Sequence, residues 1–317
     1  MHKMRQCLYA VLLVLVGLTG LLCYLCGNEQ SELVVTPRIE GNTENMDNGS
    51  ADDKKIMISD SAENHVLTKG IQALSDKDST HYSVYIAYPQ EKREPYIYQS
   101  EAMKSASMIK VFLLAAAMEK VKNGSLALDM PVILHQEDKT GGSGILSGYN
   151  NESELSLDTV LRLMITESDN TATNILIDLL GMENINDYIR RNGYSDTCLA
   201  RKMMDFAAAR AGRENYTSVR DLGDLFGRIY RHECIDYEQD EIMLSYLREQ
   251  EDRECFPAAL PEAVIAHKTG ELEGLYDDGG IIYLDDRALI VVIMTENYSK
   301  RHTAIEIMRE MVRLAAE

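Results

Sequence analysis

The 317-residue sequence contains no tryptophan, only four phenylalanines and only six prolines. These scarcities do not prevent a folded core, because hydrophobic residues make up 45% of the chain and charged residues 26%. Such fractions are typical of globular domains, so they exclude a wholly disordered chain and a fibrous repeat. At roughly 100–200 residues per domain, the length fits one large domain or two small ones.

Basic residues are scarce as well. The chain has 32 lysines and arginines against 51 aspartates and glutamates, which gives a formal net charge of −19. A chain this acidic repels phosphate backbones, so we expect no nucleic-acid partner. The seven histidines show no H-x-H or H-E-x-x-H spacing, so we expect no metal site, and no motif implies a cofactor.

Cysteines are too few for a disulfide framework. Outside the first 26 residues only Cys198, Cys234 and Cys255 remain, an odd number with no C-x-x-C spacing. A disulfide-stabilised fold would carry an even and dense set, so three free thiols are the favoured interpretation. A single Cys234–Cys255 bridge stays open as an alternative.

Residues 7–26 form a 20-residue run without a charged side chain. A helix of this length spans about 30 Å, the thickness of the hydrocarbon core of a bilayer. Basic residues precede the run and acidic ones follow, which predicts a single-pass signal anchor in the cell membrane, with residues 1–6 cytoplasmic and the rest outside. A cleaved signal peptide would also export the chain, but the bulky Tyr24 and Cys26 stand where small residues are usual.

Residues 27–65 are rich in Asn, Glu, Asp, Gly and Ser and carry few basic side chains. A segment of this composition cannot bury an apolar core, so we interpret it as an acidic extracytoplasmic linker. Residues 66–317 then form one globular domain, which we expect to be monomeric.

The pattern in this domain places strands first and last, with helices between them. Tyr-rich, β-branched stretches at 82–88 and 95–99 predict a hairpin, and three further strands are predicted within 263–296. Helical periodicity runs through most of 107–231 and returns at 302–316. Short turns join the strands, so the fold class is α/β with an antiparallel sheet of about five strands, flanked by terminal helices. A helical subdomain is inserted between the hairpin and the last strands, and a cleft is expected beside the sheet.

A possible nucleophile opens the first long helical stretch. In Ser107-Met108-Ile109-Lys110, the serine and the lysine share one helix face, one turn apart. A serine hydroxyl needs a nearby base to act as a nucleophile at neutral pH, and a desolvated lysine with a lowered pKa can serve. A helix N-terminus also supplies backbone N–H groups suited to an oxyanion.

Two further triplets carry matching chemistry. Ser168-Asp169-Asn170 lies between helical segments, where its hydroxyl can relay a proton and its amide can hold a lysine and a substrate amide. Lys268-Thr269-Gly270 ends a predicted strand, where an ammonium and a hydroxyl can bind a carboxylate and glycine permits close approach. A second Lys-Thr-Gly, at 139–141, has no strand before it, and we interpret it as a coincidence.

The order S-x-x-K, S-D-N, K-T-G resembles that of the class A β-lactamases and penicillin-binding proteins. The stretch FPAALPEAVIAHKTGE also resembles the segment that leads into the K-T-G strand of class A enzymes. The resemblance covers roughly residues 66–317 and implies the β-lactamase/DD-peptidase-like fold. It implies that Ser107 is acylated, that Lys110 is its base, and that Ser168 passes a proton to the leaving nitrogen.

The same resemblance assigns the substrate contacts. Asn170 would contact the acylamide of the substrate, and Lys268 and Thr269 would hold the carboxylate of a β-lactam or a D-Ala-D-Ala peptide. Gly270 would let the substrate lie against the strand edge. The oxyanion hole would be formed by the backbone N–H groups of Ser107 and Glu271.

Two features depart from the class A pattern. No E-x-x-L-N motif follows Ser168-Asp169-Asn170, although its glutamate activates the deacylating water in class A enzymes. Asp205 lies nearest the expected place and is a possible deacylation base; the alternative is a helix cap or an ion pair with a neighbouring basic residue. Asp277 and Asp278 stand where many class A enzymes carry an arginine, so Arg301 or its neighbour Lys300 would have to supply that cation.

The residues that acylation requires are therefore all present in the sequence. The sequence does not, however, predict turnover, because the usual deacylation base is absent. The favoured interpretation is an exported serine hydrolase that opens β-lactam amides through a Ser107 acyl-enzyme and deacylates slowly. A D-Ala-D-Ala carboxypeptidase acting on peptidoglycan and a penicillin-binding sensor that stays acylated are the alternatives, and a degenerate binding protein is disfavoured by the three intact motifs.

Overall fold

The computed structural model describes residues 62–91 and 93–317. The predicted anchor (7–26), the segment before it (1–6) and nearly all of the predicted linker (27–65) lie outside the described residues. The first described element is helix α2 (Ala62–Ser75), which begins slightly before the boundary predicted at residue 66. Within the described part of the chain, no helix is long and apolar enough to cross a bilayer.

A five-stranded antiparallel sheet forms the centre of the domain, as the sequence predicts. The strands lie in the order β2-β1-β9-β8-β7, so β7, which carries Lys268, is an edge strand. Their bounds are β1 His81–Ala87, β2 Tyr96–Tyr98, β7 Val264–Leu272, β8 Leu275–Tyr283 and β9 Ala288–Glu296. An edge strand leaves one row of backbone groups without a strand partner, and these are available to a ligand.

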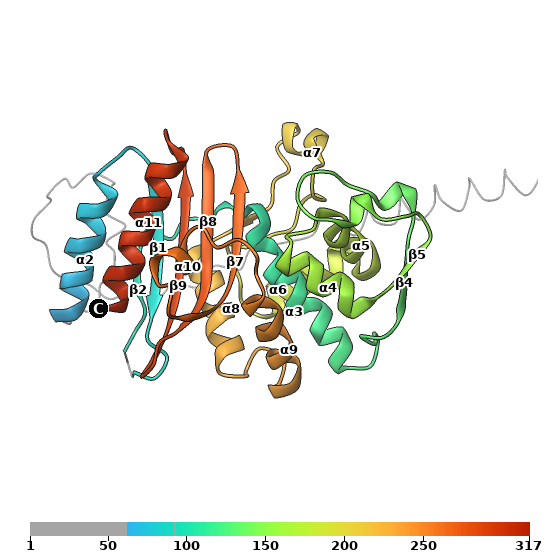
Figure 1. Cartoon of the computed structure of the whole chain (residues 1–317), viewed down its shortest axis with the longest axis horizontal. Coiled ribbons are helices and arrows are strands. Elements are labelled where there is room, and N and C mark those ends of the chain that lie inside the picture. Colours follow the sequence, from blue (N-terminus) through green and yellow to red (C-terminus); the bar gives the residue numbers. More distant parts are fainter. Residues whose placement is uncertain (1–61, 92) are drawn as a thin grey trace, which may run out of the picture. The chain divides into compact units, whose positions relative to one another are not determined.

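Helices cover both faces of the sheet. Helix α2 packs beside α11 (Arg301–Ala316) on one face, as the two neighbouring helices in Figure 1 show. Helix α8 (Val219–Tyr230) packs against β1, β8 and β9 on the other face. Strand β9 is therefore buried along almost its whole length, which explains its unbroken run of aliphatic residues.

The helical subdomain is built around α3 (Ile109–Lys122), whose first ten residues are all buried. A helix that is apolar on every side is expected at the centre of a bundle. Around it lie α4 (Leu157–Thr166), α5 (Asn170–Leu180), α6 (Met182–Arg191) and α9 (Tyr237–Arg248). This part lies on the side of the sheet away from α2 and α11 (Figure 1).

Several short elements were not predicted from the sequence. Strand β3 (Met103–Lys104) pairs with β6 (Tyr216–Thr217), and β4 (Pro131–Leu134) pairs with β5 (Ser153–Ser156). Helices α7 (Phe206–Arg210) and α10 (Phe256–Ala259) are also short. Segments of two to five residues are too brief to show a hydrophobic period.

The three cysteines of the domain are free thiols. Cys198 is exposed, Cys234 is half-buried and Cys255 is buried. The favoured interpretation is thereby confirmed, and the Cys234–Cys255 bridge left open by the sequence is not formed.

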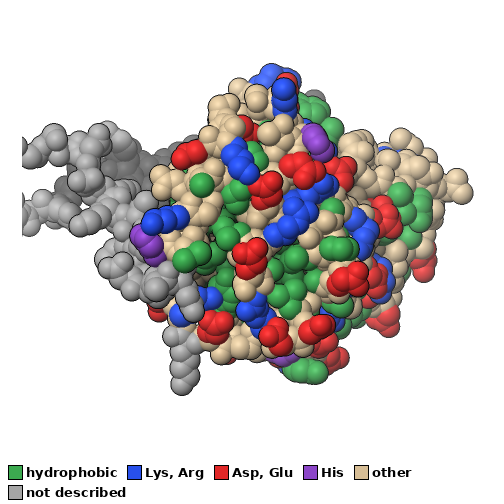
Figure 2. Space-filling view, turned by 60° about the vertical axis from the view of Figure 1, so that its left-hand side comes forward, with side chains coloured by type: hydrophobic (Ala, Val, Ile, Leu, Met, Phe, Trp, Pro, Cys, Tyr) green, Lys and Arg blue, Asp and Glu red, His purple; other side chains and the backbone are tan. Residues whose placement is uncertain are grey.

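Acidic and basic side chains are interspersed on the face of the domain drawn in Figure 2. Apolar side chains form a core cluster on either side of the sheet, and Lys110 and Lys268 are the only lysines among the buried residues of the described part of the chain.

Candidate active site

Ser107 lies in a short 3₁₀ turn, Ala106–Met108, that leads into α3 at Ile109. Met108 N donates to Ser105 O at 2.8 Å to close this turn. Ala106 adopts a left-handed φ of 41°, a conformation that costs a non-glycine residue about 1–3 kcal/mol. The sequence predicted a helix from Ser107; the structure instead presents the half-buried serine on a tight turn before the helix.

Strand β7 packs directly against this turn at Gly270. A Cβ atom at Gly270 would lie 3.1 Å from Ala106 Cβ and 3.2 Å from Ser107 N, closer than ordinary contact allows. A side chain at this position would push the turn away from the strand by a few tenths of an ångström, so glycine favours the close approach. The same contact brings Glu271 and Ser107 to the wall of one cavity, so the two predicted oxyanion donors belong to residues that lie together.

Two buried lysines converge on Ser168. Lys110 Nζ donates to Ser168 Oγ at 3.1 Å, to Ser168 O at 2.5 Å and to Asn170 Oδ1 at 3.0 Å. Lys268 Nζ donates to the same Ser168 Oγ at 3.1 Å and to Thr269 O at 2.7 Å. Both lysines have no exposed surface. The structure thus brings all three predicted motifs into one polar cluster.

The S-D-N turn is held in place by its aspartate. Ser168 has a left-handed φ of 52° between α4 and α5. Asp169 caps α5 by accepting from Ala172 N at 2.9 Å, and its other oxygen accepts from the backbone of Ile145 and Leu146 at 2.7 and 2.8 Å. The aspartate thereby fixes the serine beside it.

Burial sets the protonation of both lysines. It lowers the pKa of Lys110 well below its usual range, the nearby Lys268 charge lowers it further, and Asp169 partly opposes this shift. Burial also lowers the pKa of Lys268, to about 7, against the opposing charges of Asp252 and Asp278. Lys110 is therefore suited to be a neutral base at physiological pH.

A cavity of about 220 Å³ opens beside Ser107. Its polar wall includes Ser107, Asn170 and Glu271, which the sequence predicted for the site. Its apolar wall is formed by Met203, Met204, Phe206 and Leu272, and the remaining lining residues are Ala106, Gly142, Ser143, Arg201 and Asn215. Of the predicted residues, Lys110, Ser168, Lys268, Thr269 and Gly270 are not among the lining residues.

The loop 141–144 is a part of the site that sequence reasoning missed. Asn170 N donates to Ser143 O, and Asn170 Nδ2 donates to Gly141 O, both at 3.1 Å. The preceding Lys139-Thr140 follows a 3₁₀ turn rather than a strand, and Thr140 N donates to Thr171 Oγ1. The second Lys-Thr-Gly thus supports α5. In the sequence, the only feature that marks this loop is the adjacent glycine pair at 141–142.

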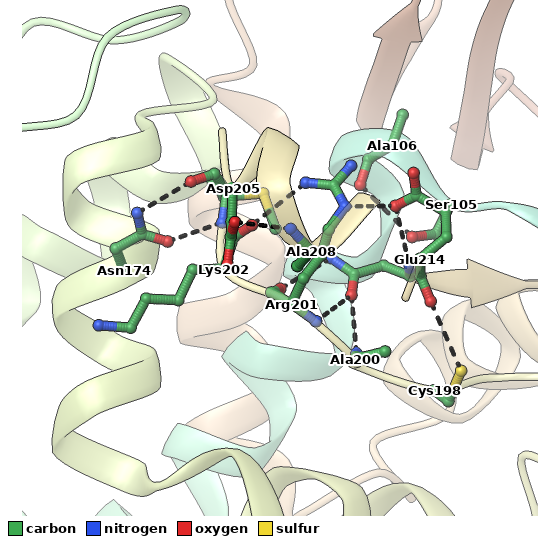
Figure 3. A network of polar contacts seen from close by, with 12 residues as sticks. Ser105, Ala106, Asn174, Cys198, Ala200, Arg201, Lys202, Asp205, Ala208 and Glu214 are labelled. Atoms are coloured by element: carbon green, nitrogen blue, oxygen red, sulfur yellow. Dashed lines mark hydrogen bonds and ion pairs between the residues drawn. The ribbon is translucent and has the colours of Figure 1, made fainter. Parts of the chain in front are cut away.

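Asp205, the possible deacylation base, is exposed and caps α7. Its Oδ1 accepts from Ala208 N at 2.9 Å, as Figure 3 shows, and the residue does not line the cavity. The structure therefore gives Asp205 the alternative role of a helix cap. The neighbouring basic residues form ion pairs with other carboxylates. Arg201 Nε binds Glu214 Oε1 at 2.7 Å, and Lys202 binds Asp178.

Met203, an apolar residue close to Asp205 in the chain, lines the same cavity as Ser107. Its backbone is fixed by Asn174, whose Oδ1 accepts from Met203 N at 2.8 Å and whose Nδ2 donates to Met203 O at 3.2 Å. Met203 as a whole is only 8% exposed. Nothing in the local sequence marks Met203, because the residue that places it lies on another element.

Comparison with known proteins agrees with this geometry. A family model described as the β-lactamase enzyme family matches residues 66–317. The extended-spectrum β-lactamase PER-1 of Pseudomonas aeruginosa is 23% identical over 251 residues, which cover 75% of this chain and 82% of PER-1.

Solved structures give the same result. A β-lactamase from Sphaerobacter thermophilus matches with 27% identity and a TM-score of 0.72, covering 79% of this chain and 95% of that one. The structure of PBP-A matches with 25% identity and a TM-score of 0.72, covering 79% and 94%. The fold predicted from the three motifs is confirmed, and the chain belongs to the β-lactamase enzyme family.

Proposed function

We propose that this protein opens β-lactam amides through a covalent Ser107 acyl-enzyme and releases the product slowly. The observation that carries the proposal is the convergence of Lys110 and Lys268 on Ser168 Oγ, beside a cavity lined by Ser107. Family relatives that are named β-lactamases support the substrate class.

In the acylation step, Lys110 takes the proton of the Ser107 hydroxyl, and the oxygen attacks the lactam carbonyl carbon. The backbone N–H groups of Ser107 and Glu271 stabilise the resulting oxyanion. When the C–N bond breaks, Ser168 gives its proton to the leaving nitrogen and regains one from Lys110. Lys268 and Thr269 hold the carboxylate of the substrate, and Asn170 contacts its acylamide.

Release of the acyl group requires a base for water, and the cavity provides little. Glu271 is the only carboxylate among the described lining residues, and Arg301 binds it at 2.7 Å. Met203 and Met204 fill the wall instead. General-base catalysis contributes about 10²–10⁴-fold, so its absence leaves a long-lived acyl-enzyme.

A long-lived acyl-enzyme also suits a D-Ala-D-Ala carboxypeptidase or a penicillin sensor. The specific observation in their favour is the apolar Met203 at the cavity wall. PBP-A, which matches this chain, has a variant solved as an acyl-enzyme complex with penicillin G. The rate of release distinguishes these functions from a rapid β-lactamase.

Fluorescent penicillin tests the acylation step. The full chain should become covalently labelled, and Ser107→Ala should remove the label while circular dichroism shows an intact fold. The neighbouring Ser105→Ala serves as a matched control that keeps the label. Labelling of the Ser107→Ala protein would refute the assignment.

We further propose that residues 7–26 anchor the domain outside the cell membrane. The support is the uncharged run itself, with basic residues before it and acidic residues after it. In cell fractionation the full chain should remain in membranes after carbonate washing, and protease added to spheroplasts should release an active fragment. Release by carbonate, or a mature N-terminus just after Cys26, would contradict the anchor.

A further inference from the structure

The cavity wall carries a carboxylate that is already paired with a guanidinium. Arg301 Nε donates to Glu271 Oε1 at 2.7 Å, and Arg301 Nη2 donates to Glu271 Oε2 at 3.0 Å. Arg301 Nη1 also donates to Glu254 Oε2 at 2.6 Å. One positive charge is therefore shared by two carboxylates, and the cluster of Arg301, Glu271 and Glu254 carries a net negative charge. These hydrogen bonds raise the pKa of Arg301, and the bond to Glu271 has the largest effect. The guanidinium therefore stays charged.

Packing fixes where this group lies. Glu271 pairs with Tyr276 across the β7–β8 hairpin, and the Arg301 guanidinium lies 5.1 Å from the centre of the Tyr276 ring. Arg301 is the first residue of α11, so helix, hairpin and ring together hold the guanidinium beside Glu271, which lines the cavity. Its side chain is 36% exposed and that of Glu271 is 47% exposed. Exposed ion pairs contribute little, so an incoming carboxylate can displace this one.

The strand alternation sets the direction of the Glu271 side chain. Residues two apart on a strand point to the same face, so Glu271 shares a face with Thr269, while Lys268 and Gly270 share the other. Lys268 and Thr269 are the residues proposed to hold the carboxylate of the substrate. The Glu271 carboxylate and a bound substrate carboxylate are therefore neighbours of like charge.

We propose that Glu271 is a specificity-determining residue that competes with the carboxylate of the substrate for Arg301. In the free enzyme Glu271 occupies the guanidinium and repels an anionic ligand, which weakens the capture of carboxylate-bearing β-lactams. The capture of a substrate whose carboxylate is masked is not weakened by this arrangement. The inference rests on the proposed acylation of Ser107.

The test compares a penicillin with its methyl ester, which lacks the negative charge. For each protein, the ratio of the two second-order acylation rate constants, acid over ester, is measured by intact mass. In Glu271→Gln this ratio should rise about tenfold, because a repulsive charge is lost and one side of Arg301 is freed. Glu254→Gln is the matched control: it changes a partner of the same arginine outside the cavity wall, and the ratio should change less than threefold.

Removal of the cation distinguishes competition from simple packing. Arg301→Gln leaves Glu271 without its partner, so the ratio should fall below that of the unmodified protein. The double variant Glu271→Gln/Arg301→Gln should lose most of the gain seen in Glu271→Gln and keep only the part that comes from the lost repulsion. An unchanged ratio in Glu271→Gln, or the full gain without Arg301, would overturn the competition. If neither compound acylates the unmodified protein, the proposed function fails as well, whereas acylation with an unchanged ratio overturns this inference alone.

Discussion

Lys110 Nζ and Lys268 Nζ each donate a hydrogen bond of 3.1 Å to the same oxygen, Ser168 Oγ. Two fully buried ammonium groups this close cannot both be charged without a large desolvation and repulsion cost. The shared hydroxyl therefore links a lysine that is readily deprotonated with one that carries charge near neutral pH. This division matches the two roles that acylation requires, a base and a carboxylate anchor.

A bell-shaped pH dependence of acylation follows. Lys110 must be neutral to act as a base, so the rate constant should fall on the acid side as Lys110 becomes protonated. Lys268 must be charged to hold a carboxylate, so the rate constant should fall again above its pKa of about 7. Second-order acylation measured from pH 5 to pH 9 by stopped-flow checks both limbs.

Replacement of Lys268 by arginine identifies the alkaline limb. A guanidinium keeps its charge throughout this range, so Lys268→Arg should show no fall in acylation up to pH 9. The acid limb, which belongs to Lys110, should remain. An alkaline limb that is unchanged in Lys268→Arg would mean that another group titrates there.

Met203→Glu should create the missing water-activating base. Asn174 holds the Met203 backbone, so the new carboxylate would enter the cavity wall beside Ser107. We expect the lifetime of the acyl-enzyme to shorten at least tenfold, toward the 10²–10⁴-fold typical of general-base catalysis. Intact mass recorded after removal of free penicillin gives the lifetime.

Two variants control this result. Met203→Gln has the same shape without the base and should leave the lifetime within about threefold of the unmodified value. Asp205→Asn should also have little effect, because the Asp205 carboxylate caps α7 outside the cavity. A lifetime lengthened tenfold by Asp205→Asn would restore Asp205 as the base.

Asp277 should destabilise the fold at neutral pH. It is completely buried, Thr295 N donates to its Oδ1 at 2.9 Å, and its Oδ2 has no hydrogen-bond partner. Burial raises the pKa of Asp277 well above its usual value. Because the folded-state pKa exceeds the unfolded one, the free energy of unfolding should fall as pH rises from about 4 through the folded pKa.

Asp277→Asn removes that charge and keeps the acceptor for Thr295. Urea denaturation should show the variant more stable by about 1–3 kcal/mol at pH 8 and nearly equal to the unmodified protein at pH 4. The exposed Asp286→Asn is the control and should change neither value. Lower stability of Asp277→Asn at pH 8 would contradict this account.

The sequence allowed the main sheet and the motif cluster to be predicted, because both follow local patterns. The aliphatic run of β9 and the order of Ser107, Ser168 and Lys268 are legible without coordinates. The wall of the cavity is not, because it depends on contacts between distant elements. Met203 is placed by Asn174, and Gly144 adopts a φ of 103° where a Cβ would meet Asp169 at 2.2 Å.

The role of Asp205 could not be predicted from the sequence either. Its position in the chain suggested a base, but a carboxylate at the first turn of a helix is captured by free backbone N–H groups. The start of α7 at Phe206 determines that role, and a five-residue helix leaves no periodic trace. Glu271 likewise looked like a backbone donor alone until its pairing with Arg301 was visible.

Time-resolved intact mass of the full chain with excess penicillin tests the central claim most directly. We predict that one penicillin adds to each chain rapidly, that the adduct maps to Ser107, and that it decays far more slowly than it forms. Product release should then show a burst followed by slow turnover. Rapid steady turnover with no accumulated adduct would contradict slow deacylation, and an adduct on any other residue would contradict the assignment of Ser107.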